Sequence, residues 1–254
     1  ISRFEKFHSE LNFITERVTE TLGNLYAMHW PFKQHTTSRN IKLMPYHDHL
    51  KSKGACFGQS AAYERPMWYS LNGKDADYDY SYGYQNWYES AKHETINARK
   101  NVALFELSPF AKFELSGDNT HSNLQYLCAN DIKNEIGYIT YTQMLNSKGG
   151  IEADLTVTCI EKNTFRIVTG SSVREHDKKH ILKNLDKSVK LKDITDDLAC
   201  FGLFGPKSRD LVSKLFGNHF SNNDFRFGTG KIITLNDITM WFQRISYVGE
   251  LGWE

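Results

Sequence analysis

The run "NSKGG", residues 146–150, separates two stretches in which apolar and polar residues alternate. The first stretch is "YITYTQML" (138–145) and the second is "IEADLTVTCIE" (151–161). Alternation with a period of two is typical of β-strands whose two faces differ, and paired glycines supply the positive φ angles that tight turns require. The sequence therefore predicts an antiparallel hairpin here.

Other stretches along the chain switch between strand and helix patterns. Apolar residues spaced three or four apart between Phe7 and Leu25 predict one or two amphipathic helices. Segments rich in Tyr and Trp at 55–71 and 75–90 predict short β-strands with turns. Further strands are expected at 164–170 and 198–205, and further helices at 45–53, 174–185 and 206–216. This order predicts an α+β fold with antiparallel pairing, in preference to a doubly wound parallel sheet.

Length and charge limit the kinds of partner that the chain can have. Its 254 residues allow one or two domains, and the return to a helical pattern predicts a boundary near Ser90. Because 31 basic residues balance 30 acidic ones, the charge gives no indication of a nucleic-acid or anionic-membrane surface. No apolar run is long enough to span a membrane, so we expect a soluble protein.

Two further features concern the cysteines and the chain ends. Four well-separated cysteines without a C-x-x-C pair favour reduced, buried thiols over disulfides. The absence of an initiator Met, together with an alternating apolar pattern that continues to the last residue, leads us to expect a fragment of a longer protein.

Asp154 is unusual because carboxylates are depleted in strands and costly to bury without a partner. Alternation alone favours the simplest interpretation, in which Asp154 shares a solvated strand face with Glu152, Thr156 and Thr158. Glu250 follows Gly249 at an expected turn, where a charged residue needs no functional explanation.

Common catalytic and metal-binding motifs are missing. The run "FGTGKI" (227–232) is neither a dinucleotide fingerprint nor a P-loop, and no G-x-S-x-G elbow is present. His176 and His180 lie four residues apart, as a zinc-binding pair on one helix face would. Their helix is strongly charged and no third ligand is close in sequence, so we predict a solvated helix face and no metal site.

Several stretches together resemble a known family. The runs "FELSPFAKFELSG" (105–117), "YTQMLNSKGGIEADLTVT" (141–158), "FRIVTGSS" (165–172) and "RISYVGELGWE" (244–254) resemble the folate-binding domain of the aminomethyltransferase (glycine cleavage T-protein) family. Upstream, "RNIKLMPYHDHLKSKGACFGQSAAYERPMWY" (39–69) resembles the segment that links the flavin domain to the folate domain in sarcosine and dimethylglycine dehydrogenases, with sarcosine dehydrogenases as the nearer likeness.

The resemblance implies a fold, a domain arrangement and an activity. It implies that residues 1–90 are the C-terminal part of a flavin-dependent oxidoreductase region, an α+β segment that packs on a flavin-binding domain outside this chain. It implies that residues 91–254 are a T-protein-like folate-binding domain, truncated at its C-terminus, with mixed or antiparallel sheets and packed helices. The parent enzyme would oxidise an N-methyl amine, sarcosine or dimethylglycine, with FAD, and this part would capture the one-carbon unit on tetrahydrofolate as methylene-tetrahydrofolate.

The resemblance also implies roles for individual residues. Asp154 falls on the family's aspartate beside the reacting folate nitrogens, and Glu250 falls on the glutamate that binds the pterin ring. Tyr141 matches a tyrosine that lines the folate site. Glu106 stands where the family more often has Asp, which is compatible with a structural role.

Two alternatives of other classes stay open. One is a non-catalytic homologue that resembles the pyruvate dehydrogenase phosphatase regulatory subunit, and the other is a stand-alone aminomethyltransferase or demethylase of the T-protein fold. The main interpretation implies an N-methylated glycine, folate and an electron acceptor as partners, without nucleic acid or membrane. It implies a location in the bacterial cytoplasm or the mitochondrial matrix.

Overall fold

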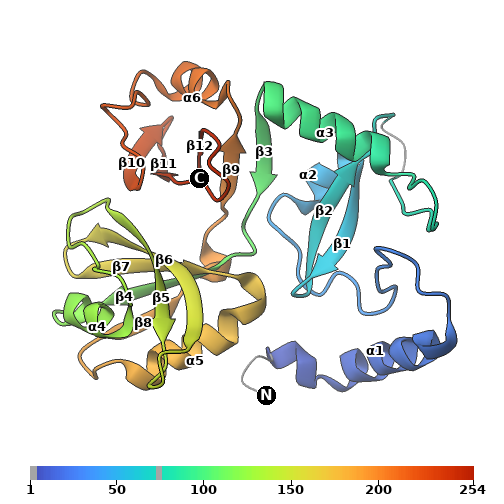
Figure 1. The fold of residues 1–254 in the computed structure, drawn as a ribbon, viewed down its shortest axis with the longest axis horizontal. Coiled ribbons are helices and arrows are strands. Elements are labelled where there is room, and N and C mark those ends of the chain that lie inside the picture. The colour runs from blue at the N-terminus through green and yellow to red at the C-terminus, as the bar shows by residue number, and fades with distance from the viewer. Residues whose placement is uncertain (1–4, 73–75) are drawn as a thin grey trace. The chain divides into compact units, whose positions relative to one another are not determined.

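The computed structural model describes residues 5–72 and 76–254 and divides the chain into two compact units between Asn97 and Ala98 (Figure 1). In the described residues, no helix is both long and apolar enough to cross a membrane. The elements of the first unit are η1 (Lys6–Ser9), α1 (Leu11–Gly23), η2 (Asn24–Tyr26), α2 (His47–Ser52), β1 (Ala55–Ser60), β2 (Tyr63–Tyr69) and α3 (Tyr88–Lys100). The last turn of α3 extends past the division into the second unit.

The first unit is held together by polar contacts around a small antiparallel pair, β1 and β2. The carboxylate of Glu64 on β2, only 1% exposed, forms a bidentate ion pair with Arg39, from Nε to Oε1 at 2.8 Å and from Nη2 to Oε2 at 2.5 Å. The backbone N–H of Asn40 donates to the same carboxylate at 2.8 Å. A buried charge with three donors is well satisfied, so this pair fixes the 39–40 segment against β2.

Helix α1 differs from the expected amphipathic helix in how it is attached. None of its residues is buried, and Leu11, at its start, is 76% exposed. Its attachments are polar, since Arg17 Nη2 donates to Thr37 O at 2.9 Å and to Gln59 Oε1 at 2.8 Å. The periodicity predicted the helix correctly, but its apolar residues do not form a core in the described chain.

The second aromatic segment was predicted wrongly as strands. Residues 76–87 contain no strand, while Asp75 lies outside the described residues. The tyrosines pack through their rings instead, with Tyr78 stacked on Tyr80 at a centroid distance of 5.6 Å and edge-on to Trp68 at 6.1 Å. Aromatic residues raise strand propensity only where a neighbouring strand is available for pairing.

The second unit contains one five-stranded sheet, a three-stranded sheet and a two-stranded hairpin, all antiparallel. The strand orders are β5-β6-β7-β4-β8, β12-β9-β3 and β10-β11. This arrangement confirms the predicted α+β class and the antiparallel hairpin. The elements are β3 (Ala103–Glu106), β4 (Ala111–Ser116), α4 (Thr120–Leu127), β5 (Ile139–Leu145), β6 (Ile151–Glu161), β7 (Thr164–Thr169), η3 (Ser171–Val173), α5 (Arg174–Asn184), β8 (Lys190–Asp193), η4 (Thr195–Asp197), β9 (Phe201–Phe204), α6 (Ser208–Phe216), β10 (Thr229–Leu235), β11 (Ile238–Arg244) and β12 (Gly252–Trp253).

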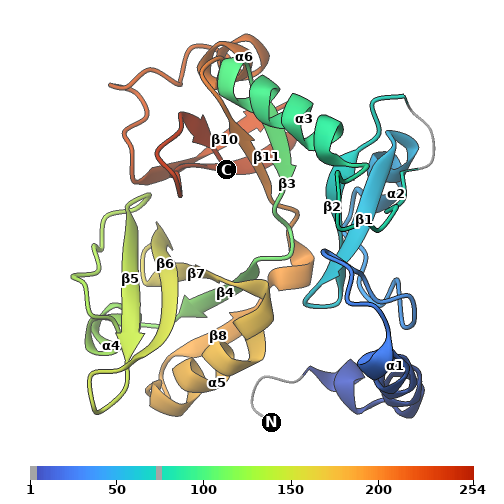
Figure 2. The ribbon, with the colours of Figure 1, turned by 45° about the vertical axis from the view of Figure 1, so that its right-hand side comes forward.

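The main core lies between one face of the five-stranded sheet and helices α4 and α5 (Figure 2). Phe113, Phe165 and Ile167 from the strands meet Leu124 of α4 and Ile181 of α5, and all five are fully buried. A second cluster joins Val212, Phe220, Phe225 and Trp253. The four cysteines form no disulfide, and Cys56, Cys128 and Cys159 are buried as predicted, whereas Cys200 is half-buried.

Close backbone contact joins the start of β5 to β10, and it depends on Gly137. Gly137 has φ +88°, and a Cβ there would lie 2.4 Å from Gly230 O. Gly149 in the predicted turn has φ +77° but open space around it. Of the two glycines predicted to supply positive φ angles to the turn, Gly149 has one and Gly150 does not.

We therefore predict that Gly137→Ala destabilises the second unit more than Gly149→Ala does. Gly149→Ala carries the left-handed backbone cost of about 1–2 kcal/mol, and Gly137→Ala adds the overlap, about 1–3 kcal/mol more. Urea unfolding of the two variants measures the difference. Equal destabilisation would show that the close approach to Gly230 contributes nothing.

Candidate functional site

Asp154 and Tyr141 lie on one face of the β5–β6 hairpin. Asp154 pairs with Gln143 and Tyr141 pairs with Thr156, so the two side chains are diagonal neighbours across the strands. The alternate residues of β6, Ala153 and Leu155, are buried in the core. Asp154 is exposed and Tyr141 is 60% exposed, so this face is open and carries a carboxylate beside a phenol.

The Asp154 carboxylate raises the pKa of the neighbouring Tyr141 hydroxyl. Hydrogen bonding to Asp154 is the main reason that the pKa of Tyr141 is raised, and the negative charge of Asp154 adds to the effect. Tyr247, in the loop after β11, contributes electrostatically to the same raised pKa.

The loop that carries Glu250 follows β11 directly. Arg244, the last residue of β11, pairs with Thr229, which bridges to Tyr138 just before β5. This register brings the 245–251 loop to the Tyr141 end of the hairpin. Glu250 itself accepts a hydrogen bond within the loop, from Ser246 Oγ to Oε2 at 2.9 Å.

Glu254 is a second carboxylate near this loop, and sequence reasoning missed it. Its backbone pairs with Gln243 of β11 in both directions, and its Oε2 accepts from Gln243 Nε2 at 2.9 Å. Burial raises the pKa of Glu254. In "GELGWE" (249–254), Glu254 lies four residues after Glu250, so regular alternation would put both side chains on the same strand face. Glu254 also directly follows Trp253, which is buried.

Two cations share the face of the sheet that carries Asp154. Arg166 of β7 pairs with Thr158 of β6, two pairs along from Thr156, which pairs with Val168 of β7. Val168 in turn pairs with Lys112 of β4, so Arg166 and Lys112 point to the same face as Thr156 and Asp154. Arg166 stacks over Trp241 at 5.9 Å, and burial lowers its pKa. Lys112 Nζ donates to the carbonyls of Ser108 and Phe110, both at 2.8 Å.

These contacts correct the simplest interpretation of the strand. Thr156 is half-buried and Thr158 is only 2% exposed, so only the Asp154 end of this face is solvated. Thr158 is buried although it lies on the same face of the strand as Asp154.

Glu106 accepts hydrogen bonds from Ser108 with Oε1, while its Oε2 is buried without a partner. Ser108 in turn accepts a bond from the backbone N–H of Cys200 at 2.9 Å. These contacts link the end of β3 to the segment before β9, which is the structural role that the sequence allowed for Glu106.

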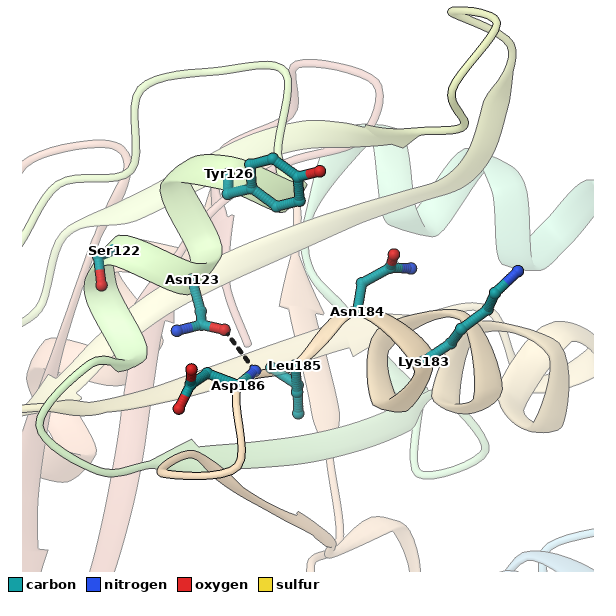
Figure 3. Close-up of a pocket in the computed structure, with 7 residues that line it drawn as sticks. All are labelled: Ser122, Asn123, Tyr126, Lys183, Asn184, Leu185 and Asp186. Carbon is teal, nitrogen blue, oxygen red and sulfur yellow. Dashed lines mark hydrogen bonds between the residues drawn. The ribbon is translucent and has the colours of Figure 1, made fainter.

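A surface pocket of about 380 Å³ lies elsewhere, between the ends of α4 and α5 (Figure 3). Asn123 Oδ1 there accepts from the backbone N–H of Asp186 at 2.8 Å. Tyr141, Asp154 and Glu250 are not among its lining residues. Within residues 5–72 and 76–254, no three His, Cys, Asp or Glu side chains are arranged to hold a metal ion.

Comparison with known proteins identifies the family. Residues 46–254 match the GCVT N-terminal domain, and residues 1–43 match the FAD dependent oxidoreductase central domain. The solved structure of glycine cleavage system aminomethyltransferase T from Bartonella henselae is 21% identical and covers 84% of this chain and 52% of its own, with a TM-score of 0.66. That similarity confirms the predicted T-protein fold.

Among curated relatives, 4-methylaminobutanoate oxidase (formaldehyde-forming) of Paenarthrobacter nicotinovorans is 38% identical over 255 residues, which are all of this chain and 31% of that protein. Human mitochondrial dimethylglycine dehydrogenase is 36% identical over 208 residues (81% of this chain, 24% of that protein), and human mitochondrial sarcosine dehydrogenase is 28% identical over 293 residues (98% and 32%). The chain thus spans about a quarter to a third of these relatives' length. These matches confirm the family resemblance drawn from the sequence, but the nearer likeness expected to sarcosine dehydrogenase was wrong, since dimethylglycine dehydrogenase is the more identical of the two. The chain belongs to the GCVT N-terminal domain family.

Proposed function

We propose that this chain is part of a flavin- and tetrahydrofolate-dependent N-methyl amine dehydrogenase and that this part captures the one-carbon unit as methylene-tetrahydrofolate. The observation that carries the proposal is the Tyr141–Asp154 pair on the open face of the β5–β6 hairpin, within a T-protein fold. The names of the relatives support an N-methylated amino acid, such as sarcosine or dimethylglycine, as substrate of the whole protein.

The side chains around this face fit a reduced folate. The pterin ring presents N–H and amino donors on one edge, and carboxylates accept such paired hydrogen bonds. Glu250 and Glu254 flank the short β12 strand and supply two such carboxylates. The exposed rings of Tyr141 and Tyr247 offer flat surfaces for a heteroaromatic group.

Each residue then has a chemical task. Tetrahydrofolate supplies the two nitrogens that take up the one-carbon unit. In this proposal Asp154 accepts or returns a proton at those nitrogens, and the exposure of its carboxylate supports this role. Tyr141 donates to this carboxylate, and Glu250, with Glu254, holds the pterin edge.

The part of the chain that matches an oxidoreductase domain lacks one common flavin-binding feature within its described residues. Between residues 5 and 43 the only glycine is Gly23, so this part of the described chain has no glycine-rich dinucleotide loop. We propose that FAD is bound by other parts of the full protein and that electrons leave through a separate acceptor.

The proposed domain division keeps residues 1–90 with the oxidoreductase region and 91–254 as the folate-binding domain. It falls between the start of the family match at residue 46 and the division of the compact units after Asn97. The mitochondrial and bacterial relatives support a location in the mitochondrial matrix or the bacterial cytoplasm.

Calorimetric titration of the full-length protein with tetrahydrofolate tests the pterin carboxylates. Glu250→Gln should weaken binding by about 1.5–3 kcal/mol, the scale of a hydrogen bond to a charged group. Glu254→Gln is the matched variant, since it also exchanges a carboxylate for an amide next to β12. If Glu254→Gln alone weakens binding, the pterin role belongs to Glu254, and unchanged affinity in both variants would refute the proposed contacts.

A further inference from the structure

Glu152 is the extra residue of a β-bulge in β6. In the ladder, Met144 pairs with Ala153 and Leu145 pairs with Ile151, so Glu152 has no partner on β5. A bulge of this kind redirects a side chain relative to regular alternation. Glu152 and Asp154 were expected on the same solvated face, and this expectation was wrong because the bulge turns Glu152 toward α5.

His176 of α5 lies between two carboxylates. Its Nε2 is 3.3 Å from Glu152 Oε2, and its Nδ1 is 2.9 Å from Asp177 Oδ1. Asp177 is only 1% exposed, and its Oδ2 accepts from Thr169 Oγ1 of β7 at 2.6 Å. The predicted solvated helix face therefore contains a chain of contacts that runs from the bulge to a buried anchor on β7.

The other oxygen of Glu152 reaches the hairpin turn. Asn146 Nδ2 donates to Glu152 Oε1 at 2.9 Å, while Asn146 Oδ1 accepts from the backbone N–H groups of Lys148 and Gly150, both at 2.9 Å. Glu152 thus connects the turn with α5. The bond from Asn146 is the main reason that the pKa of Glu152 is lowered, and His180 and His176 contribute.

We propose that His176 is a positioning residue that ties the β5–β6 hairpin to α5 and thereby fixes the place of Asp154. The functional part of this inference rests on the proposed role of Asp154 toward folate. Asp154 is two residues from Glu152 on the same strand, and its own side chain is exposed. Its position is therefore set by the backbone, which the Glu152–His176–Asp177 contacts hold on the opposite side of the strand.

Two amide substitutions separate the two ring contacts of His176. Asparagine places a donor near the position of Nδ1, so His176→Asn keeps the contact to Asp177 and loses the one to Glu152. Glutamine places a donor near Nε2, so His176→Gln keeps the contact to Glu152. If the contact between His176 and Glu152 holds the hairpin against α5, only His176→Asn should make the hairpin more mobile.

Hydrogen exchange of the full chain, read at residues 144–155, is the first measurement. In His176→Asn we expect about threefold to tenfold faster exchange there, the scale of one lost hydrogen bond, with β4 and β7 unchanged. His176→Gln should stay near the wild-type rate. Equal exchange in both variants and the wild type would overturn the proposal, and so would faster exchange spread over β4 and β7.

Tetrahydrofolate affinity of the full-length protein is the second measurement. It should fall by a similar factor in His176→Asn and stay unchanged in His176→Gln. Affinity that is lost equally in both variants would contradict the tie. If the wild type binds no tetrahydrofolate, the proposed function fails, while an exchange difference confined to residues 144–155 still supports the structural tie.

Discussion

Asp154→Ala in the full-length protein should leave oxidation of the N-methyl amine nearly unchanged while free formaldehyde accumulates in the presence of tetrahydrofolate. The proposed flavin chemistry takes place outside this chain, so loss of the carboxylate affects only capture of the one-carbon unit. A positioned acid–base group contributes about 10²–10⁴-fold, and we expect capture to slow by at least about 10²-fold. Parallel assays of electron-acceptor reduction and of formaldehyde release give the two rates.

Glu161→Ala is the matched control for this experiment. It removes an exposed carboxylate from the far end of the same strand, and both rates should match those of the wild type. Asp154→Asn keeps the shape of the side chain but removes its charge and its ability to transfer a proton. If proton transfer by Asp154 drives capture, Asp154→Asn should slow capture as much as Asp154→Ala does. A parallel loss of oxidation and capture in Asp154→Ala would refute a role confined to folate.

Arg39→Met should destabilise the first unit by about 3–5 kcal/mol, because it leaves the Glu64 carboxylate buried without its cation. Burial by itself would raise the pKa of Glu64, but the bonds from Arg39 and Asn40 outweigh burial and lower it. Hydrogen exchange of β1 and β2 at increasing urea measures the loss. The double variant Arg39→Met/Glu64→Gln should recover most of it, since no charge then remains buried.

The same pair gives a pH dependence with a defined sign. Because the folded-state pKa of Glu64 is lowered, its contribution to stability is present above the ordinary glutamate pKa and is lost as the pH falls through the lowered value. The double variant lacks this term and should lose less stability in acid. Equal acid sensitivity of the wild type and the double variant would contradict the assignment.

Local patterns predicted much of the fold. The turn at Gly149 and the alternation on either side of it were sufficient for the β5–β6 hairpin, and helical spacing of apolar residues was sufficient for α1. The pattern failed in residues 76–87, where ring stacking replaced strand pairing. It also gave α1 an apolar face without showing that this face would be exposed in the described chain.

The candidate site was only partly accessible from the sequence. Asp154, Tyr141 and Glu250 came from resemblance to a family, and their roles remain predictions. Glu254 was missed because its burial depends on pairing between β11 and the residues after β12. The proximity of Tyr141 and Asp154 could not be predicted from the sequence either, because residues that are diagonal neighbours on two strands depend on the pairing register.

The sequence by itself determined that a hairpin forms at residues 138–161 and that its two faces differ, because turn chemistry and period-two alternation act over a few neighbouring residues. Only the tertiary structure decided which acidic side chains point where. A bulge turns Glu152 toward His176 and leaves Asp154 beside Tyr141 on the open face. The physical reason is that a bulge is a property of the pairing between two strands, and one of the contacts that hold Glu152 comes from His176 of α5, more than twenty residues farther along the chain.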